Sequence, residues 1–512
     1  MRDDPSWWEP LIIVGLFVGS LVHALQFRHL PDDAYISFRY AVNFAEGAGL
    51  VFNPGEYVMG YSNFLWVILL GIGKQIGISA PVLAPVLGMV SGWGILAIVY
   101  FYLRHTHGKI LAATAGAALL VFNGTFALWL VGGLEGPLFG LLLLVGVVLA
   151  LELDADSKPR TYLVLGAVFG LVALSRYEGV FYAVPVAGYL MLRERNWRRA
   201  KCVSIFLGTT LLIFGIFTGW IFYYYGDPMP NTVYAKFHPI SVALLARGFR
   251  VSKLFVTGYL GVPLIVLVIW ALVTHLRWRA KGWLPLVIIA VFVAFYLRIG
   301  GDLQVYYRMW FWVLPMLALL LGEAVALFST DRSRQVISSV LILVLLAASL
   351  QHSFRGGEKR RVVIDEDLAR GIALIGEAIG KENPGATVAA NNVGIIAYVS
   401  RLNILDTLGL TNRHIAKAPG KKVGIPAHES HDSDYVLAQK PDFIFYGPLM
   451  RYPQPVSLEY ATRRGYPSDR ELKKDPRLAR EYAFVHIRLA DGQYAPVFRR
   501  RDYVQSQYDP AR

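Results

Sequence analysis

Residues 81–103 read PVLAPVLGMVSGWGILAIVYFYL, an apolar run without a charged side chain. A helix needs about 20 apolar residues to cross the hydrocarbon core of a bilayer, so this run predicts a membrane-spanning helix. Comparable apolar blocks occur from residue 10 to residue 352. The 512-residue chain is 55% hydrophobic and 17% charged, whereas soluble proteins carry about 25% charged residues. This composition, with the single cysteine Cys202, excludes a soluble globular protein, a disordered chain and a disulfide scaffold.

Twelve blocks are candidates for membrane spans: 10–26, 61–78, 81–103, 110–131, 134–153, 161–174, 178–192, 202–225, 254–275, 283–299, 305–328 and 335–352. The most basic loop, RERNWRRAK at 193–201, is placed in the cytoplasm by the positive-inside rule. The loop with Arg279 and Lys281 should lie on the same side. Block 61–78 contains several polar residues and glycines, and it therefore predicts an interfacial helix rather than a span.

This count gives a polytopic α-helical membrane protein with about 11 transmembrane helices in the cell inner (cytoplasmic) membrane. The N-terminus is predicted to be cytoplasmic, with an uncleaved first helix around Leu11–Ala24. Residues 1–352 form the predicted membrane domain, in which residues 27–80 are the first external loop with interfacial helices.

Beyond residue 353 the chain becomes charged and turn-rich, and residues 353–512 predict an extracytoplasmic α/β domain. The strand-like segments are 386–390, 402–405 and 442–446, and residues 393–400 are helix-like. The segments 482–489 and 494–498 flank Asp491-Gly492 and predict a hairpin.

The polar motifs outside the basic loops all fall on the predicted external face, and the middles of the spans are almost free of ionisable residues. A transporter normally has polar groups or broken helices near the bilayer midplane. The distribution therefore favours chemistry at the outer interface over transport. The net charge of +14 lies largely in short loops between apolar blocks, so it does not indicate a nucleic-acid partner.

Two adjacent carboxylates, Asp32 and Asp33, follow Pro31 and open an amphipathic segment. One of them is accounted for by capping the start of a helix, but capping does not account for both. The functional interpretation is that one carboxylate accepts a proton from an attacking hydroxyl. The other then orients that hydroxyl or holds a divalent cation.

Four cations are predicted on the same external face, and each has two interpretations. They either extend to lipid phosphates or clamp a phosphate leaving group. These cations are Arg39, Arg176, Lys236 and Arg308. Glu135 and Glu178 each begin a span after a glycine-bearing turn, where a helix dipole alone stabilises a carboxylate.

Several blocks resemble, in the same order, those of bacterial GT-C glycosyltransferases, particularly the AftB-like arabinofuranosyltransferases. The first external loop carries Asp32–Tyr40, FNPGE at 52–56 and GYSNFLW at 60–66. The further blocks are GLEGPLF at 133–139, RYEG at 176–179, PNTVYAK at 230–236 and DTLGLT at 406–411.

The resemblance implies a GT-C fold and transfer of a sugar, arabinofuranose first, from a polyprenyl-phosphate donor. The acceptor is a cell-envelope glycan, lipid or glycoprotein on the outer face of the membrane. It implies that Asp33 or Asp32 is the base and that the four cations bind the donor phosphate. Further residues are assigned to substrate binding: Tyr61, Asn63, Glu135, Glu178, Asn231 and Asp302.

The resemblance assigns no definite cofactor. It leaves open a divalent cation, Mg²⁺ or Mn²⁺, held by Asp32 or Asp33 if one is used. Two alternative functions remain beside the glycosyltransferase. One is a flippase or transporter for a lipid-linked sugar, and the other is a structural or sensory membrane protein with a ligand-binding C-terminal domain.

Overall fold

The computed structural model describes residues 7–503 except 28, 155, 194–195, 237–238, 260, 278–282, 303, 356, 419–428 and 464. Parts of two basic loops used for the topology, Glu194-Arg195 and Arg279 through Lys281, lie outside the described residues. The chain divides into two compact units. The helical unit is Met1–His29, Ala84–Phe217 and Ile240–Val362, and the mixed unit is Leu30–Leu83, Thr218–Pro239 and Val363–Arg512.

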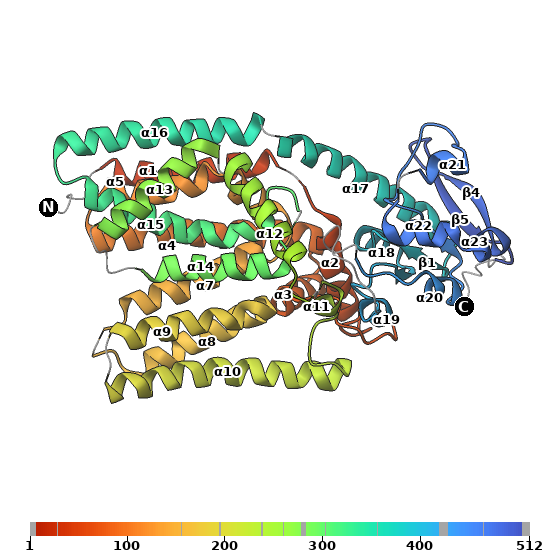
Figure 1. Ribbon diagram of the computed structural model, residues 1–512, viewed down its shortest axis with the longest axis horizontal. Coiled ribbons are helices and arrows are strands. Elements are labelled where there is room, and N and C mark those ends of the chain that lie inside the picture. The colour runs from red at the N-terminus through yellow and green to blue at the C-terminus, as the bar shows by residue number, and fades with distance from the viewer. Residues whose placement is uncertain are drawn as a thin grey trace. The chain divides into compact units, whose positions relative to one another are not determined.

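The helical unit is a bundle in which most of the long helices have roughly aligned axes (Figure 1). Its first helices are α1 (Glu9–Leu25), α4 (Ala80–His107), α5 (Ile110–Val121), α6 (Gly124–Val131), α7 (Gly136–Glu152), α8 (Pro159–Ser175), η1 (Tyr177–Tyr182), α9 (Ala183–Arg193) and α10 (Trp197–Tyr225). They are followed by α12 (Val242–Leu254), η2 (Phe255–Tyr259), α13 (Gly261–Arg277), α14 (Leu284–Ile299), η3 (Arg308–Val313), α15 (Leu314–Phe328) and α16 (Arg332–Arg355). The chain passes from one unit to the other inside three helices, which are α4, α10 and α17 (Gly357–Glu382).

Several of these helices are long and apolar enough to cross a bilayer, so the chain is a multi-pass membrane protein. Within the described residues four segments pass on length and composition, or five if the bent pair α5 and α6 is one span. They are Ala80–His107, Trp197–Tyr225, Arg308–Phe328 and Arg332–Glu382. The count of eleven spans and the orientation stay predictions.

The apolar block predicted as a span at residues 110–131 is not one continuous helix. The structure has two helices there, α5 and α6, bent by 63° relative to each other. Asn123 lies at the break, and its side chain accepts a hydrogen bond of 3.1 Å from the backbone N–H of Phe126. This cap starts a new helix where hydrophobicity alone predicts a continuous one.

The mixed unit combines the first loop with the C-terminal region. Its helices are α2 (Asp32–Ala45), α3 (Phe64–Gln75), α11 (Asn231–Lys236), α18 (Gly394–Ser400), α19 (Arg413–Ala416), α20 (Ser433–Ala438), α21 (Leu458–Ala461), α22 (Pro467–Lys474), α23 (Pro476–Glu481) and most of α17. Helix α3 has 12 residues, so it is about 18 Å long at 1.5 Å per residue. This length is well short of the roughly 30 Å hydrocarbon core.

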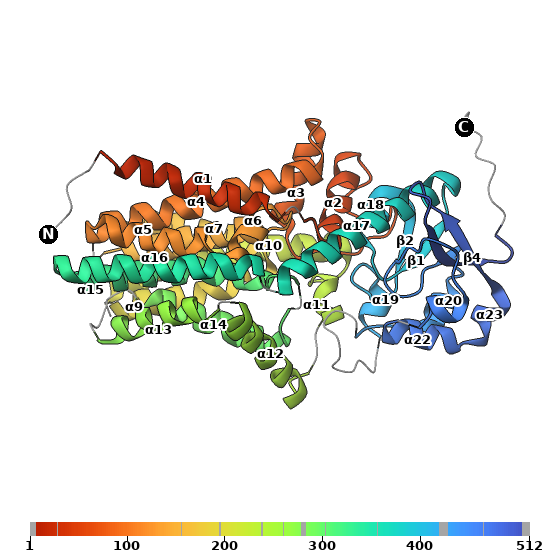
Figure 2. The ribbon, with the colours of Figure 1, turned by 90° about the horizontal axis from the view of Figure 1, so that it is seen from above.

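A five-stranded mixed sheet lies in the mixed unit, with strand order β2-β1-β3-β5-β4. Its strands are β1 (Thr387–Ala390), β2 (Asn403–Asp406), β3 (Phe443–Ile444), β4 (Tyr482–Arg488) and β5 (Tyr494–Arg500). The first three pair in parallel, and β5 pairs antiparallel with both β3 and β4. The strands and the hairpin predicted from the alternation of apolar residues are therefore present (Figure 2).

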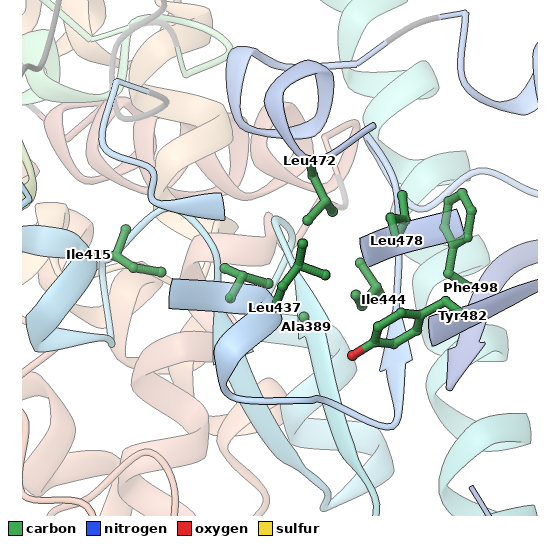
Figure 3. Packing of buried hydrophobic residues seen from close by; sticks show 9 residues of the cluster. Ala389, Ile415, Leu437, Ile444, Leu472, Leu478, Tyr482 and Phe498 are labelled. Atoms are coloured by element: carbon green, nitrogen blue, oxygen red, sulfur yellow. The ribbon is translucent and has the colours of Figure 1, made fainter. Parts of the chain in front are cut away.

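One hydrophobic core joins the sheet to the helices beside it. Ala389 and Ile444 contribute from the parallel strands, and Tyr482 and Phe498 from the hairpin (Figure 3). Helices α20, α22 and α23 add Leu437, Leu472 and Leu478. This core fixes the end of β2, where Asp406 lies.

Helix α18 packs tightly on the start of α2, and Gly394 permits the approach. A Cβ added at Gly394 would lie 1.9 Å from the backbone oxygen of Asp32. We expect Gly394→Ala to destabilise the protein by at least about 1–3 kcal/mol, because backbone has to shift to relieve such overpacking. The measurement is the apparent melting temperature of the detergent-solubilised chain.

The matched control is Gly376→Ala in α17, where the added Cβ would have its nearest neighbour at 3.4 Å. Alanine favours helix over glycine, so this variant should melt at the wild-type temperature or above it. Equal melting temperatures for the Gly394→Ala variant and the wild type would contradict the packing described.

Candidate active site

Seven of the predicted site residues lie in two clusters, one in each compact unit, and each cluster also contains one residue that was not predicted, Asp406 or Trp312. The carboxylate cluster is Asp32, Asp33 and Asp406, in the mixed unit. The arginine cluster is Arg176 and Arg308 with Glu135, Glu178, Asp302 and Trp312, in the helical unit.

Asp32 and Asp33 are the first two residues of α2, and both side chains are half-buried. Pro31 precedes them in an extended conformation, with ψ of 157°, which sets the start of the helix. One of the two aspartates was predicted to cap the start of its own helix. Asp32 does cap a helix, but that helix is α18 rather than α2. Its Oδ1 accepts from the N–H of Ile395 at 2.7 Å, and its Oδ2 accepts from the N–H of Gly394 at 3.1 Å.

Asp406 lies at the end of β2 and closes the turn that follows. It is 1% exposed, and it accepts hydrogen bonds from the N–H groups of Leu408, Gly409 and Thr411. Gly409 has φ of +79°, a conformation that glycine adopts without strain. Asp406 thus stabilises the turn after β2, a common role of aspartate.

The electrostatics of the carboxylate cluster favour protonation of Asp32. The pKa of the Asp32 carboxyl is raised to about 6, mainly by burial. The N–H donors of Ile395 and Gly394 lower this pKa, and the charges of Asp33 and Asp406 raise it. Burial also raises the pKa of Asp406. With a pKa of about 6, the Asp32 carboxyl changes its charge just below neutral pH.

The raised pKa of Asp32 predicts a pH-dependent stability. The folded state holds this proton more tightly than the unfolded chain, whose aspartate pKa is about 4. The free energy of unfolding should therefore fall as the pH rises from about 4 to about 6, and it should change little above that window. Asp32→Asn should remove this part of the pH dependence in denaturation curves recorded across the window.

The control for this measurement is Asp331→Asn, which removes an exposed carboxylate from an ion pair with Arg334. The Asp331→Asn variant should show the wild-type decrease in the free energy of unfolding between about pH 4 and pH 6. If the Asp32→Asn variant also shows this decrease, Asp32 does not titrate in this window.

Arg39, predicted to bind phosphate, is 2% exposed and contacts the protein backbone. Its Nε donates to the carbonyl oxygen of Phe52 at 3.1 Å, and Nη2 lies 3.4 Å from the carbonyl oxygens of Arg401 and Leu402. The guanidinium group thereby links the first loop to the loop before β2. No pattern in the sequence indicates these long-range partners.

Three of the predicted substrate-binding residues are buried in the mixed unit. The hydroxyl of Tyr61 lies 3.0 Å from that of Tyr225, and the amide of Asn63 donates to Ser37 at 3.1 Å. Asn231 donates to the carbonyl oxygens of Gly409, Leu410 and Asn412 at 2.8–3.2 Å. By contrast, the side chain of Lys236 at the end of α11 is exposed.

A further contact in this unit was not anticipated from the sequence. Lys417 forms an ion pair with Asp227 and lies 4.3 Å from the ring centroid of Tyr234. The hydroxyl of Tyr234 also donates to Asp227 at 2.6 Å. The PNTVYAK motif thus contacts the segment after β2 through Tyr234 as well as through Asn231.

Arg176 is the centre of the arginine cluster. It follows α8 and forms ion pairs with Glu135, which precedes α7, and with Glu178 of η1. The Glu178 contact is 2.7 Å. The guanidinium carbon lies 4.5 Å from the ring centroid of Trp312. Trp312 was not singled out in the sequence because it lies within an apolar block.

Arg308 follows two tyrosines with strained backbone. Tyr306 and Tyr307 have φ of 50° and 48°, which residues other than glycine rarely adopt. Tyr306 is held there by a hydrogen bond from Thr125 to its carbonyl oxygen, 2.9 Å, and by one from its own N–H to Glu358, 3.0 Å. Such strain commonly marks functional positions. This bend in the backbone positions Arg308 beside Asp302, with Nε of Arg308 3.1 Å from Oδ2 of Asp302.

The two arginines are close enough for the charge of Arg308 to act on that of Arg176. The structure therefore brings together five predicted site residues: Arg176, Arg308, Glu135, Glu178 and Asp302. Within the described part of the chain, no three His, Cys, Asp or Glu side chains are placed to hold a metal ion.

Comparisons with known proteins agree with this architecture. Residues 64–223 match the family model of dolichyl-phosphate-mannose-protein mannosyltransferases, and residues 363–504 match a domain of unknown function, DUF8728. A relative described as terminal beta-(1->2)-arabinofuranosyltransferase, from Mycobacterium tuberculosis, is 28% identical over 248 residues. The alignment spans 45% of this chain and 38% of that relative, so the chain covers well under half the relative's length.

Two similar solved structures cover nearly the whole chain. ArnT from Cupriavidus metallidurans, bound to undecaprenyl phosphate, has a TM-score of 0.62 at 12% identity, covering 96% of this chain and 98% of ArnT. The archaeal oligosaccharyltransferase AglB from Archaeoglobus fulgidus, in complex with an inhibitory peptide and a dolichol-phosphate, has a TM-score of 0.55 at 11% identity, covering 98% and 75%. The chain therefore has the GT-C fold, and the resemblance to AftB-like enzymes expected from its motifs is confirmed.

Proposed function

We propose that this chain is a membrane glycosyltransferase that takes a sugar from a polyprenyl-phosphate donor. The observation that carries the proposal is the pair Asp32-Asp33 at the start of α2, within a chain of GT-C fold. We propose arabinofuranose as the sugar, because the motifs and the mycobacterial relative point to it. The acceptor is a cell-envelope glycan, lipid or glycoprotein on the outer face of the inner membrane.

The proposed reaction is a displacement at the anomeric carbon. The acceptor oxygen forms a bond to this carbon while the bond to the donor's phosphate oxygen breaks. The acceptor's proton passes to a carboxylate, and polyprenyl phosphate leaves with an additional negative charge. The protein therefore has to supply a base and groups that stabilise the charge on the leaving group.

We assign the base to Asp33 and a positioning role to Asp32. The carboxylate of Asp32 is oriented by two backbone N–H groups of α18, so its loss affects the fold as well as the site. Asp33 is its neighbour in the first turn of α2, and its side chain is half-buried. Aspartate as general base requires no metal step.

We assign the phosphate of the donor to the arginine cluster. The charges of the two guanidinium groups act on each other, and one phosphate group would accept hydrogen bonds from both. Arginine also suits phosphate because it donates two parallel hydrogen bonds. Glu135, Glu178 and Asp302 then hold the arginines in place before the donor arrives. Arg39 contributes to the fold in this scheme, because its donors contact backbone carbonyls.

A transfer assay tests the proposal. The full-length chain in liposomes is given a synthetic polyprenyl-phosphate arabinofuranose and an oligosaccharide acceptor, and the glycosylated product is measured by mass spectrometry. Product formation is expected. Movement of the intact donor between leaflets without any product would instead support the transporter alternative.

Arg308→Gln should raise the KM for the donor by about 10-fold or more, because a hydrogen bond to a charged group contributes about 1.5–3 kcal/mol. Arg334→Gln is the matched control, since Arg334 is an exposed arginine that pairs with Asp331. It should keep the wild-type KM. An unchanged KM in the Arg308→Gln variant would remove Arg308 from the donor site.

A further inference from the structure

The helical unit also contains an apolar groove between α1, α5 and α16, with a volume of about 910 Å³. This is near the upper end of the range for ligand sites, about 300–1,000 Å³. Its walls include Gly15, Leu16, Leu111, Ala115 and Leu346. None of the residues of the arginine cluster lines it. The rim is open, since Val22 and Leu343 are 54% and 67% exposed.

One end of the groove is polar. Gln26 and His23 line it there, and the ammonium group of Lys359 donates to the backbone carbonyl of Gln26. Lys359 also lies 4.5 Å from the ring centroid of Phe27. An amphiphile with its hydrocarbon chain in the groove would therefore meet a positive charge at this end.

His23 adds a hydrogen-bond acceptor at the same end. It is 4% exposed, and its Nδ1 lies 2.7 Å from the carbonyl oxygen of Val121, which requires a proton on Nδ1. In the neutral ring Nε2 then accepts, and this buried atom has no hydrogen-bond partner among the described residues. A hydroxyl group matches such an acceptor.

We propose that this groove binds one anionic glycerophospholipid, with an acyl chain between α1, α5 and α16 and the headgroup phosphate at Lys359. The apolar walls fit the chain, Lys359 fits the phosphate, and His23 favours a headgroup that carries hydroxyls, as phosphatidylglycerol does. A phospholipid is favoured over polyprenyl phosphate because phospholipid is the bulk component of a membrane and would occupy an open groove by mass action.

Native mass spectrometry of the full-length chain tests this site. The detergent-solubilised protein is titrated with phosphatidylglycerol and with phosphatidylcholine of the same acyl chains, and the bound lipid is counted. We expect preferential retention of phosphatidylglycerol. Lys359→Gln should reduce that preference about five-fold, because a lysine near an anionic lipid surface contributes about 1 kcal/mol.

Gly15→Leu should lower the binding of both lipids. Gly15 lines the groove, and a Cβ added there meets nothing within 4 Å, so the leucine side chain would extend into the groove. Gly188→Leu in α9 is the matched control, because its Cβ position is equally open and it does not line the groove. Lys253→Gln removes an exposed cation of α12 and controls for charge. Both controls should bind lipid as the wild type does.

Equal retention of the two phospholipids by the wild type would overturn the proposal, as would retention that neither variant changes. Displacement of phosphatidylglycerol by an equal concentration of polyprenyl phosphate would assign the groove to that lipid instead. A melting curve for each variant shows that the fold is kept. Because no sugar transfer is measured, these outcomes are independent of the proposed function.

Discussion

Asp33→Asn should lower the rate of sugar transfer by about 10²–10⁴-fold, the usual contribution of a general base. Asparagine keeps the size and polarity of the side chain but does not accept the proton. The N–H groups at the start of α18 donate to Asp32 and not to Asp33, so Asp33→Asn should leave the stability contributed by this cap intact. The measurement is kcat with saturating donor and acceptor, together with a melting curve.

Asp32→Asn separates the two roles. This variant should lower stability as well as turnover, because the carboxylate that orients the N–H groups of Gly394 and Ile395 becomes an amide. Glu46→Gln is a matched control at the other end of α2, where Glu46 pairs with Arg401 at 2.8 Å and is exposed. Its turnover should be that of the wild type. Wild-type rates in both aspartate variants would end the assignment of the base to this pair.

Arg176→Met is expected to destabilise the protein by about 3–5 kcal/mol, the cost of leaving a buried charge without its partner. The side chain of Glu135 is 4% exposed, and that of Glu178 is 14% exposed. Removal of Arg176 leaves both carboxylates without this cation. The face of Trp312 also loses its contact with the guanidinium group. The apparent melting temperature and the unfolding midpoint in denaturant report the loss.

A double variant shows whether the cost comes from the uncompensated charge. Arg176→Met combined with Glu135→Gln removes the cation together with the more buried carboxylate, so it should be less destabilised than Arg176→Met alone. Donor binding should be lost in both variants, because both lack the guanidinium group. If the double variant is the less stable of the two, the pair is not coupled in the way described.

Much of the fold could be predicted because its signals are local. Runs of apolar residues predicted the helices, and alternation with an Asp491-Gly492 turn predicted the hairpin of β4 and β5. Asp32 and Asp33 could be selected as candidate site residues because two adjacent carboxylates follow a proline. The break at Asn123 was missed, since one capping residue inside an apolar block changes hydrophobicity little.

The long-range partners could not be predicted from the sequence. Asp32 contacts residues 394 and 395, and Arg39 contacts residues 401 and 402, more than 350 positions along the chain. No periodicity encodes such a pairing, because it depends on how β2 and α18 are placed by their own core. Trp312 was missed for a similar reason, since an indole in an apolar block carries no sign of the arginine it contacts.

Strand β2 lies at the edge of the sheet and pairs with β1 on one side only. On its other side, the side-chain amide of Asn53 accepts from the N–H of Ile404 at 3.0 Å and donates to its carbonyl oxygen at 2.9 Å. One asparagine therefore takes the place of a neighbouring strand. An exposed strand edge favours self-association, so Asn53 protects this edge of the sheet from the addition of a strand of another molecule.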